Sequence, residues 1–307
     1  MSAGSDPSPG APSDGGRSIE ASRLPSPAAP IDGGRSIDWS RTSTDYATHR
    51  PGPPPRLYEL LAVLGVGGPG QRLLDLGTGT GLVAREFARR GAVVSGIDVA
   101  AGQIAAARES ARGEGLALDF AVAAAESIPF ADASFDAVVA SQCWMYFDVE
   151  RTLAEVRRVL EPGGVLVTTH FSWLPRADPV ARASEALVLG VNPAWQGADW
   201  SGRIAAEPAW AAGRASVTAM FWFDADIAFT RASWRGRMRA CRGVGASLPD
   251  ADVAAFDAAL AAWLDAHTAP TFTVRHRIDA HVLSPWPTSD AAATPALAEK
   301  GFSAGAD

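Results

Sequence analysis

The stretch that decides the fold is Leu73-Leu74-Asp75-Leu76-Gly77-Thr78-Gly79-Thr80-Gly81, which Leu82 follows directly. Its first half is a short apolar run that contains one acid, a pattern typical of a buried strand. Its second half alternates three glycines with threonines, and a helix is expected to begin at Leu82. Glycine permits a turn too tight for a side chain and lets a ligand approach bare backbone amides. The stretch therefore predicts a strand, a ligand-binding turn and a helix in succession.

A second acid, Asp98, ends the next apolar run, VVSGI at residues 93–97. It lies roughly twenty residues beyond the glycines, where a carboxylate can accept hydrogen bonds from both ribose hydroxyls of an adenosine. Because the carboxyl ends of parallel strands meet at one edge of a sheet, Asp98 is expected beside the glycine turn.

Two further segments complete the pattern. Residues 125–136, AESIPFADASFD, lead into the apolar run 137–140, and residues 158–167, RVLEPGGVLV, close one helix and open another strand. In their order and spacing, all these segments resemble the motif series of the class I S-adenosylmethionine-dependent methyltransferases, over about residues 45–171. The repeated strand–helix–strand units predict a mostly parallel sheet covered on both faces. The resemblance implies the Rossmann-like α/β fold of that family, with seven strands and a final antiparallel hairpin.

The main rival is a dinucleotide-binding Rossmann protein, such as an NAD-linked oxidoreductase. Its fingerprint is G-x-G-x-x-G, with a third glycine that packs the helix on the strand. Here the glycines run G-x-G-x-G, and Asp75 precedes them. Both features favour the methyltransferase interpretation. A protein that binds S-adenosylmethionine without transferring its methyl group is a further alternative.

The resemblance implies a site for S-adenosylmethionine at the ends of the strands. Asp75 is expected near the ammonium group of the cofactor, and Asp98 on its ribose diol. Ser141 and Gln142, after the fourth strand, are expected near its methionine part. The remaining implied contacts are the backbone of the glycine turn and the border of the adenine: Gly77, Thr78, Gly79, Gly81, Val99, Ala125 and Glu126. One departure is Ala124, where the family often has an aspartate that accepts from the adenine amino group.

The segment 45–51, DYATHRP, resembles a segment that precedes the first strand in related methyltransferases. There a tyrosine packs over the cofactor and an arginine meets its carboxylate, roles that fall here on Tyr46 and Arg50. A guanidinium suits this because it pairs bidentately with a carboxylate. A surface arginine before a proline-rich turn is the alternative. Tyr46 and Trp144 are also candidate aromatic walls for the sulfonium, with core packing as the alternative.

Candidate general bases are His170, after the fifth strand, and Tyr146, with His49 as a third. Histidine titrates near neutral pH, which suits proton removal from a methyl acceptor. A structural histidine is the alternative, and an amine or acidic phenol would need no protein base. No metal is expected, because Cys143 and Cys241 are the only cysteines and stand far apart.

Composition restricts the class of partner. The chain of 307 residues has a formal net charge of -7, which argues against general binding of nucleic acid. No apolar run approaches the roughly 20 residues that cross a membrane, and two isolated cysteines suit a reducing cytoplasm. The expected partner is therefore a small-molecule methyl acceptor in the cytoplasm.

The chain is expected to divide into one domain and two tails. Residues 1–38 and 287–307 are rich in small and polar residues and are expected to be disordered. The first tail repeats DGGRSI at residues 14–19 and 32–37, which is interpreted as a duplication in a linker. The domain spans residues 39–286, with a cofactor half at 45–171 and a lid and substrate half at 172–286.

The expected lid is rich in tryptophan and arginine. Four of the chain's ten tryptophans lie between Trp173 and Trp210, which favours an aromatic small substrate or a core of the lid itself. A cationic stretch without an acid contains Arg231, Arg235, Arg237, Arg239 and Arg242. Of these, Arg235, Arg239 and Arg242 share one helix face by spacing, either to bind a carboxylate or phosphate of the substrate or as a solvated surface. The predicted acceptor atom is oxygen or nitrogen.

Overall fold

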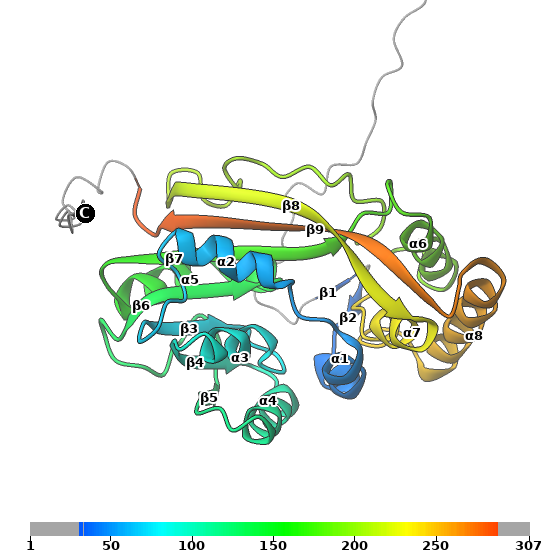
Figure 1. The fold of residues 1–307 in the computed structure, drawn as a ribbon, viewed down its shortest axis with the longest axis horizontal. Coiled ribbons are helices and arrows are strands. Elements are labelled where there is room, and N and C mark those ends of the chain that lie inside the picture. The colour runs from blue at the N-terminus through cyan, green and yellow to red at the C-terminus, as the bar shows by residue number, and fades with distance from the viewer. Residues whose placement is uncertain (1–30, 33, 288–307) are drawn as a thin grey trace, which may run out of the picture.

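A computed structural model of the chain describes residues 31, 32 and 34–287. Its main sheet has seven strands in the order β5-β4-β3-β6-β7-β9-β8 (Figure 1). The strands from β5 to β7 are mutually parallel, whereas β9 runs antiparallel to both of its neighbours. The strands are β3 (Arg72–Leu76), β4 (Val93–Asp98), β5 (Asp119–Val122), β6 (Phe135–Ser141), β7 (Leu160–Trp173), β8 (Ser216–Thr230) and β9 (Thr271–Ser284). The predicted mostly parallel, seven-stranded Rossmann-like fold is thereby confirmed.

Helices cover both faces of this sheet, as the alternating pattern predicts. The apolar sides of α2 (Pro55–Val63), α3 (Leu82–Arg89) and α4 (Ala101–Gly113) share one core with the sheet, and α5 (Val149–Val159) packs on the opposite face. Strand β3 is central and both of its faces are buried, which explains its nearly continuous apolar run. This arrangement holds the turn after β3 at the middle of the sheet edge.

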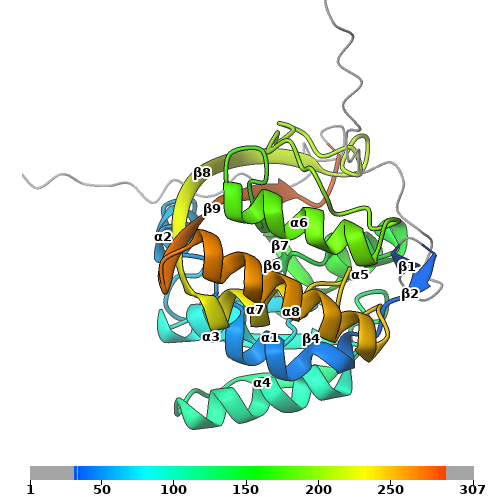
Figure 2. The same ribbon diagram turned by 90° about the vertical axis from the view of Figure 1, so that its right-hand side faces the viewer.

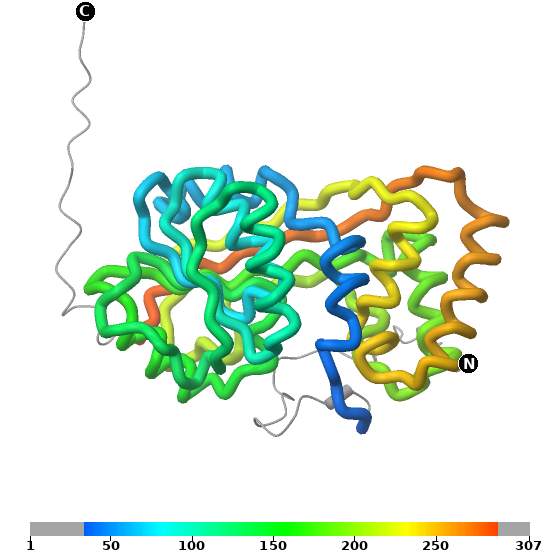
Figure 3. Tube along the Cα trace, turned by 90° about the horizontal axis from the view of Figure 1, so that it is seen from below, coloured from blue at the N-terminus to red at the C-terminus, as the bar shows by residue number. Residues whose placement is uncertain are grey.

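A second group of helices stands at the carboxyl ends of the parallel strands (Figures 1 and 2). It contains α6 (Pro179–Val191), α7 (Arg231–Arg239) and α8 (Asp250–His267), which share a third apolar core. Seen from below, α1 (Ser43–His49) lies between these helices and the cofactor half (Figure 3). The predicted helical lid near the final hairpin is therefore present, and α1 joins it to the rest of the domain.

The last three strands are longer than predicted. The sequence favours strands over residues 165–169, 217–223 and 273–283, whereas β7, β8 and β9 reach from the sheet into the lid. At the lid end, Phe229 and Val274 turn toward the core of α6, α7 and α8. The contacts that extend these strands come from helices distant in sequence. The residue pattern within one strand therefore does not predict the extension.

The N-terminal boundary at residue 38 is wrong. Residues 1–30 and 33 lie outside the described residues, and so does the first DGGRSI copy. The second copy contributes to a two-stranded hairpin, β1 (Ile31–Asp32) with β2 (Arg35–Ser36), before the 3-10 helix η1 (Trp39–Thr42). Ile37 is buried, and the amide of Asp38 donates to the carbonyl of Ala246 over 2.8 Å. The ordered domain therefore begins before residue 38. The predicted C-terminal tail, apart from Pro287, also lies outside the described residues.

Among the helices of the described residues, none combines the length and the apolar character that spanning a bilayer requires.

Candidate functional site

The turn between β3 and α3 has the conformation that its glycines predict. Gly77, Gly79 and Gly81 have φ angles of 60°, 56° and 74°, in the left-handed region where a side chain is strained. The amide of Gly79 donates to Oδ2 of Asp98 over 3.0 Å, so β4 holds the turn in place. The glycines thus leave a stretch of bare backbone beside two acids.

The two acids differ in their surroundings. Asp75 is only 1% exposed and accepts a hydrogen bond of 2.6 Å from the hydroxyl of Thr78. Burial, with a smaller contribution from the charge of Asp98, raises the pKa of Asp75 to about 7. Burial also raises the pKa of Asp98, although the amides of Ala100 and Gly79 oppose it by donating to its carboxylate. A cationic group near Asp75 would favour its ionised form.

Asp75→Asn is expected to stabilise the protein above neutral pH. A folded-state pKa of about 7 against roughly 4 in the unfolded chain means that the folded state binds more protons between these values. Stability from this group is therefore present at low pH and is lost as the pH rises through about 7. The melting temperature of Asp75→Asn should exceed the wild type's by a few degrees at pH 8 and match it near pH 4. An equal difference at both pH values would show that Asp75 does not titrate in this range.

The opposite wall comes from α1 and the residues after it. The guanidinium of Arg50 lies 4.7 Å from the ring centre of Tyr46. A Cβ at Gly79 would be 3.8 Å from Cε1 of Tyr46, so the ring packs over the glycine turn. Among residues 31, 32 and 34–287, Arg50 forms no ion pair. An anionic group in this position would find an unpaired guanidinium.

These walls border one open hollow, called here the cofactor cavity. Seven of the predicted residues line it: Tyr46, Arg50, Asp75, Gly77, Thr78, Ser141 and Gln142. Sequence reasoning did not identify the five other lining residues, which are Pro51, Pro53, Leu82, Val83 and Phe171. The φ of 63° at Gln142 is a strained conformation of the kind that concentrates at functional sites. A glycine, an acid and an unpaired guanidinium around one hollow fit a ligand with an amino acid part.

The residues expected around the adenine lie farther along the sheet edge. Val99 directly follows β4 and is 67% exposed, an unusual state for an apolar side chain that a flat ring could cover. Ala125 is buried, and the carboxylate of Glu126 accepts from the amide of Asp148 over 2.8 Å. The side chain of Glu126 therefore supports the start of α5, and only its backbone remains for a ligand.

The candidate base His170 lies apart from the cofactor cavity. Its Nδ1 is 3.0 Å from Oδ2 of Asp279, which pairs with it across β7 and β9. Because side chains alternate along a strand, both residues lie on the sheet face opposite Phe171, which lines the cavity. Burial lowers the pKa of His170, but the charge and hydrogen bond of Asp279 outweigh it, so the pKa is raised. A histidine that retains its proton is a poor base, so this geometry does not favour His170 in that role.

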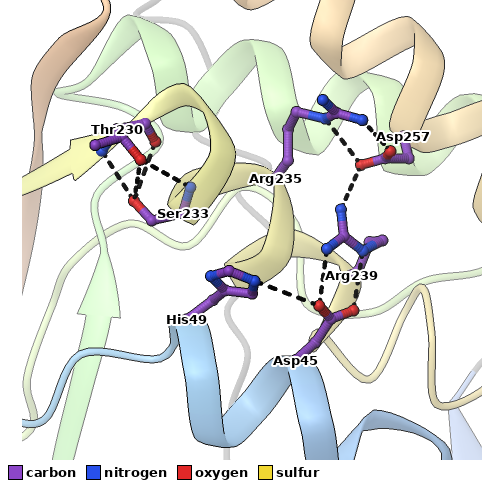
Figure 4. Close-up of polar contacts among 7 residues, drawn as sticks. All are labelled: Asp45, His49, Thr230, Ser233, Arg235, Arg239 and Asp257. Carbon is purple, nitrogen blue, oxygen red and sulfur yellow. Dashed lines mark hydrogen bonds and ion pairs between the residues drawn. The ribbon is translucent and has the colours of Figure 1, made fainter.

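The other two candidate bases also have structural partners. The hydroxyl of Tyr146 accepts from Arg242 over 3.1 Å, and its ring meets Trp39 edge to face. His49 lies 3.7 Å from a carboxylate oxygen of Asp45 and packs closely on Gly236 of α7 (Figure 4). Neither lines the cofactor cavity.

The lid tryptophans mainly build its core. Trp144, a candidate wall for the sulfonium, is buried against Trp210 at a ring distance of 4.6 Å and does not line the cavity. Trp195 is also buried, and the indole NH of Trp173 donates to Glu185 over 2.6 Å. Packing therefore accounts for the rings, while the indole NH groups of Trp144 and Trp195 are buried without a hydrogen-bond partner among the described residues.

The arginine-rich helix divides into paired and unpaired residues. Arg239 lies 2.7 Å from Asp45 and 2.8 Å from Asp257, and Arg235 also binds Asp257 (Figure 4). The face that sequence spacing selected is thus largely occupied by carboxylates of α1 and α8. Arg237 points elsewhere and is buried, and its spacing gave no signal for it.

Comparison with known proteins finds methyltransferases among the proteins that this chain resembles. The family profile described as a methyltransferase domain matches residues 74–168. A demethylmenaquinone methyltransferase of Thermus thermophilus is 43% identical over 109 residues, which are 34% of this chain and 50% of that protein. The ubiquinone/menaquinone biosynthesis C-methyltransferase UbiE of Bordetella avium is 38% identical over 133 residues, 42% of this chain and 51% of the relative. The chain thus spans about half the length of the curated relatives it matches.

A solved structure of a candidate type II methyltransferase from Anaeromyxobacter dehalogenans shares the fold. It has a TM-score of 0.51 and 24% identity, and the match covers 77% of this chain and 97% of the other. The family profile falls on the cofactor half, where the turn and its acids lie. Residues 74–168 thus match the methyltransferase domain family, and the described chain has the Rossmann-like fold of the class I S-adenosylmethionine-dependent methyltransferases that it resembles.

Proposed function

We propose that this chain transfers a methyl group from S-adenosylmethionine to an oxygen or nitrogen atom of a small metabolite. The observation that carries the proposal is the cofactor cavity, where the glycine turn, Asp75 and Arg50 line one hollow. Bound S-adenosylmethionine supplies a methyl group already activated by its sulfonium. The chain's own residues then have to bind the cofactor and the acceptor, orient them in line, and exclude water.

The residues divide between the two ends of the cofactor. Arg50 would pair with its carboxylate, Asp75 with its ammonium, and Tyr46 would cover the methionine part from α1. Asp98 would accept from the ribose hydroxyls, because its carboxylate oxygens keep free lone pairs beside their backbone partners. Val99 and the backbone of Ala125 and Glu126 would border the adenine. Asp75 is assigned to the ammonium of the cofactor, and no histidine of the described residues lines the cavity, which favours an acceptor that loses its proton readily.

A carbon acceptor is the second candidate. The name of the relative from Bordetella avium includes C-methyltransferase. The match with that relative covers 42% of this chain, so an oxygen or nitrogen atom remains our first proposal.

Calorimetric titration with S-adenosylhomocysteine, with NAD as the control ligand, tests the cofactor. We expect micromolar binding of the first and no heat from the second. Binding of NAD alone would replace the proposal with a dinucleotide-dependent activity. After the expected result, an acceptor screen with S-adenosylmethionine that carries a labelled methyl group would identify the atom methylated.

A further inference from the structure

Arg237 is a buried cation without an anionic partner. It lies on α7 and is 7% exposed. Other arginines on or beside this helix are bound by acids or a phenol: Arg231 by Asp265, Arg235 by Asp257, Arg239 by Asp45 and Asp257, and Arg242 by Tyr146. In the part of the chain that the structure describes, Arg237 forms no ion pair and no hydrogen bond to a carboxylate.

The surroundings of Arg237 are unfavourable to its charge. Burial, followed by repulsion from Arg50, lowers the pKa of Arg237 to about 9. Its guanidinium does lie 4.9 Å from the ring centre of Trp173, but a cation–π contact offsets only part of the desolvation of a buried charge. A fold without use for this charge would be more stable with an apolar residue here.

A second polar group without a partner lies near Arg237. Nδ1 of His276 is 2.8 Å from the carbonyl of Val274, while its Nε2 is buried and has no hydrogen-bond partner. Burial, aided by the charges of Arg237 and Arg50, lowers the pKa of His276 to about 3, so the ring is neutral and Nε2 accepts. The ring also packs 4.8 Å from Phe171, which lines the cofactor cavity. The guanidinium of Arg237, a donor, and Nε2 of His276, an acceptor, thus both lack a hydrogen-bond partner in the described part of the chain, just beyond the wall of the cofactor cavity.

We propose that Arg237 binds a carboxylate of the methyl acceptor, so that the substrate is an organic acid held beside the cofactor cavity. This inference rests on the proposed function. Arg50 lines the cavity and is assigned to the cofactor's own carboxylate, whereas Arg237 does not line it. One guanidinium matches the single charge of a carboxylate, and a phosphate would call for more donors. Nε2 of His276 would accept a hydrogen bond from a hydroxyl or amine of the same substrate.

Thermal denaturation tests whether Arg237 binds a ligand or stabilises the fold. Arg237→Met, which keeps an apolar stem against Trp173, should raise the melting temperature of the ligand-free protein by a few degrees. The matched variant Arg239→Met should lower it, since Asp45 and Asp257 lose their partner. A comparable decrease in both variants would show that Arg237 is structural and overturn the proposal.

Binding of acetate, followed by broadening of its 13C-carboxyl resonance, tests the ligand class. We expect saturable broadening with the wild type, an apparent Kd roughly tenfold or more weaker in Arg237→Met, and no broadening for neutral acetamide. Equal broadening in both proteins, or none in the wild type, would overturn the proposal. Tighter binding of methyl phosphate than of acetate would overturn the assignment to a carboxylate.

Titration with S-adenosylhomocysteine separates the two arginines. Its affinity should be nearly unchanged in Arg237→Met, whereas Arg50→Met should weaken it roughly tenfold or more. A comparable loss in Arg237→Met would assign Arg237 to the cofactor and overturn the inference about the acceptor. Failure of the wild type to bind S-adenosylhomocysteine would instead overturn the proposed function, since acetate binding is measured without it.

Discussion

Asp98→Ala is expected to weaken binding of S-adenosylhomocysteine by about 2–3 kcal/mol, roughly 30- to 150-fold in Kd. The carboxylate is the proposed acceptor for both ribose hydroxyls, and hydrogen bonds to a charged group exceed those between neutral groups. It also holds the turn, because it accepts from Gly79 over 3.0 Å and from Ala100 over 2.8 Å. Alanine removes the ligand contact and the support of the turn together. Calorimetry with the purified variant measures the loss.

Two controls separate these contributions. Asp119→Ala removes an exposed carboxylate from the start of the neighbouring strand β5, and should leave cofactor affinity unchanged. Asp98→Asn keeps an oxygen that can accept from one backbone amide, so its melting temperature should lie closer to the wild type's while its affinity stays low. Affinity within about threefold of the wild type in Asp98→Ala would show that the ribose contact is misassigned.

The cofactor half could be predicted from the sequence because its signals are local. The sequence favours strands over residues 72–76 and 135–141, and β3 and β6 have these bounds, since each is a compact apolar run between turn signals. The glycine turn sits directly between β3 and α3, so the positions of its two neighbouring elements follow from chain order alone. Asp98 then reaches the turn because parallel strands align their carboxyl ends.

The substrate half could not be predicted to the same depth. Its strands are longer than predicted because they pack on helices that are distant in sequence. The sheet face on which a side chain lies depends on the register between neighbouring strands. His170 illustrates this, since its place at the end of a strand suggested the site, while its pairing with Asp279 sets it on the other face. Spacing along α7 selected Arg235 and Arg239, but only the positions of Asp45 and Asp257 show that those charges are already paired and that Arg237 is not.

Gly77→Ala is expected to lower the free energy of unfolding by about 3 kcal/mol. The residue has a φ of 60°, and a side chain in the left-handed region costs roughly 1–2 kcal/mol. A Cβ there would also lie 2.8 Å from Cβ and 2.9 Å from Sγ of Cys143, closer than packed atoms allow. Cys143 is buried and its thiol donates to the carbonyl of Leu76 over 3.0 Å, so it has little room to yield. Urea denaturation followed by circular dichroism measures the change.

Gly115→Ala is the matched control for backbone strain. Gly115 has a nearly equal φ of 67°, but nothing lies within 4 Å of a Cβ placed on it. Gly115→Ala should lower the free energy of unfolding only by the backbone strain, roughly 1 kcal/mol. The difference in the free energy of unfolding between the two variants therefore measures the contact with Cys143. If both variants lose the same amount of stability, the segment after β6 that contains Cys143 moves to make room, and Gly77 is required only for its backbone conformation. A larger loss at Gly77 would instead show that the turn is fixed by packing against the residues after β6, which place Ser141 and Gln142 in the wall of the cofactor cavity.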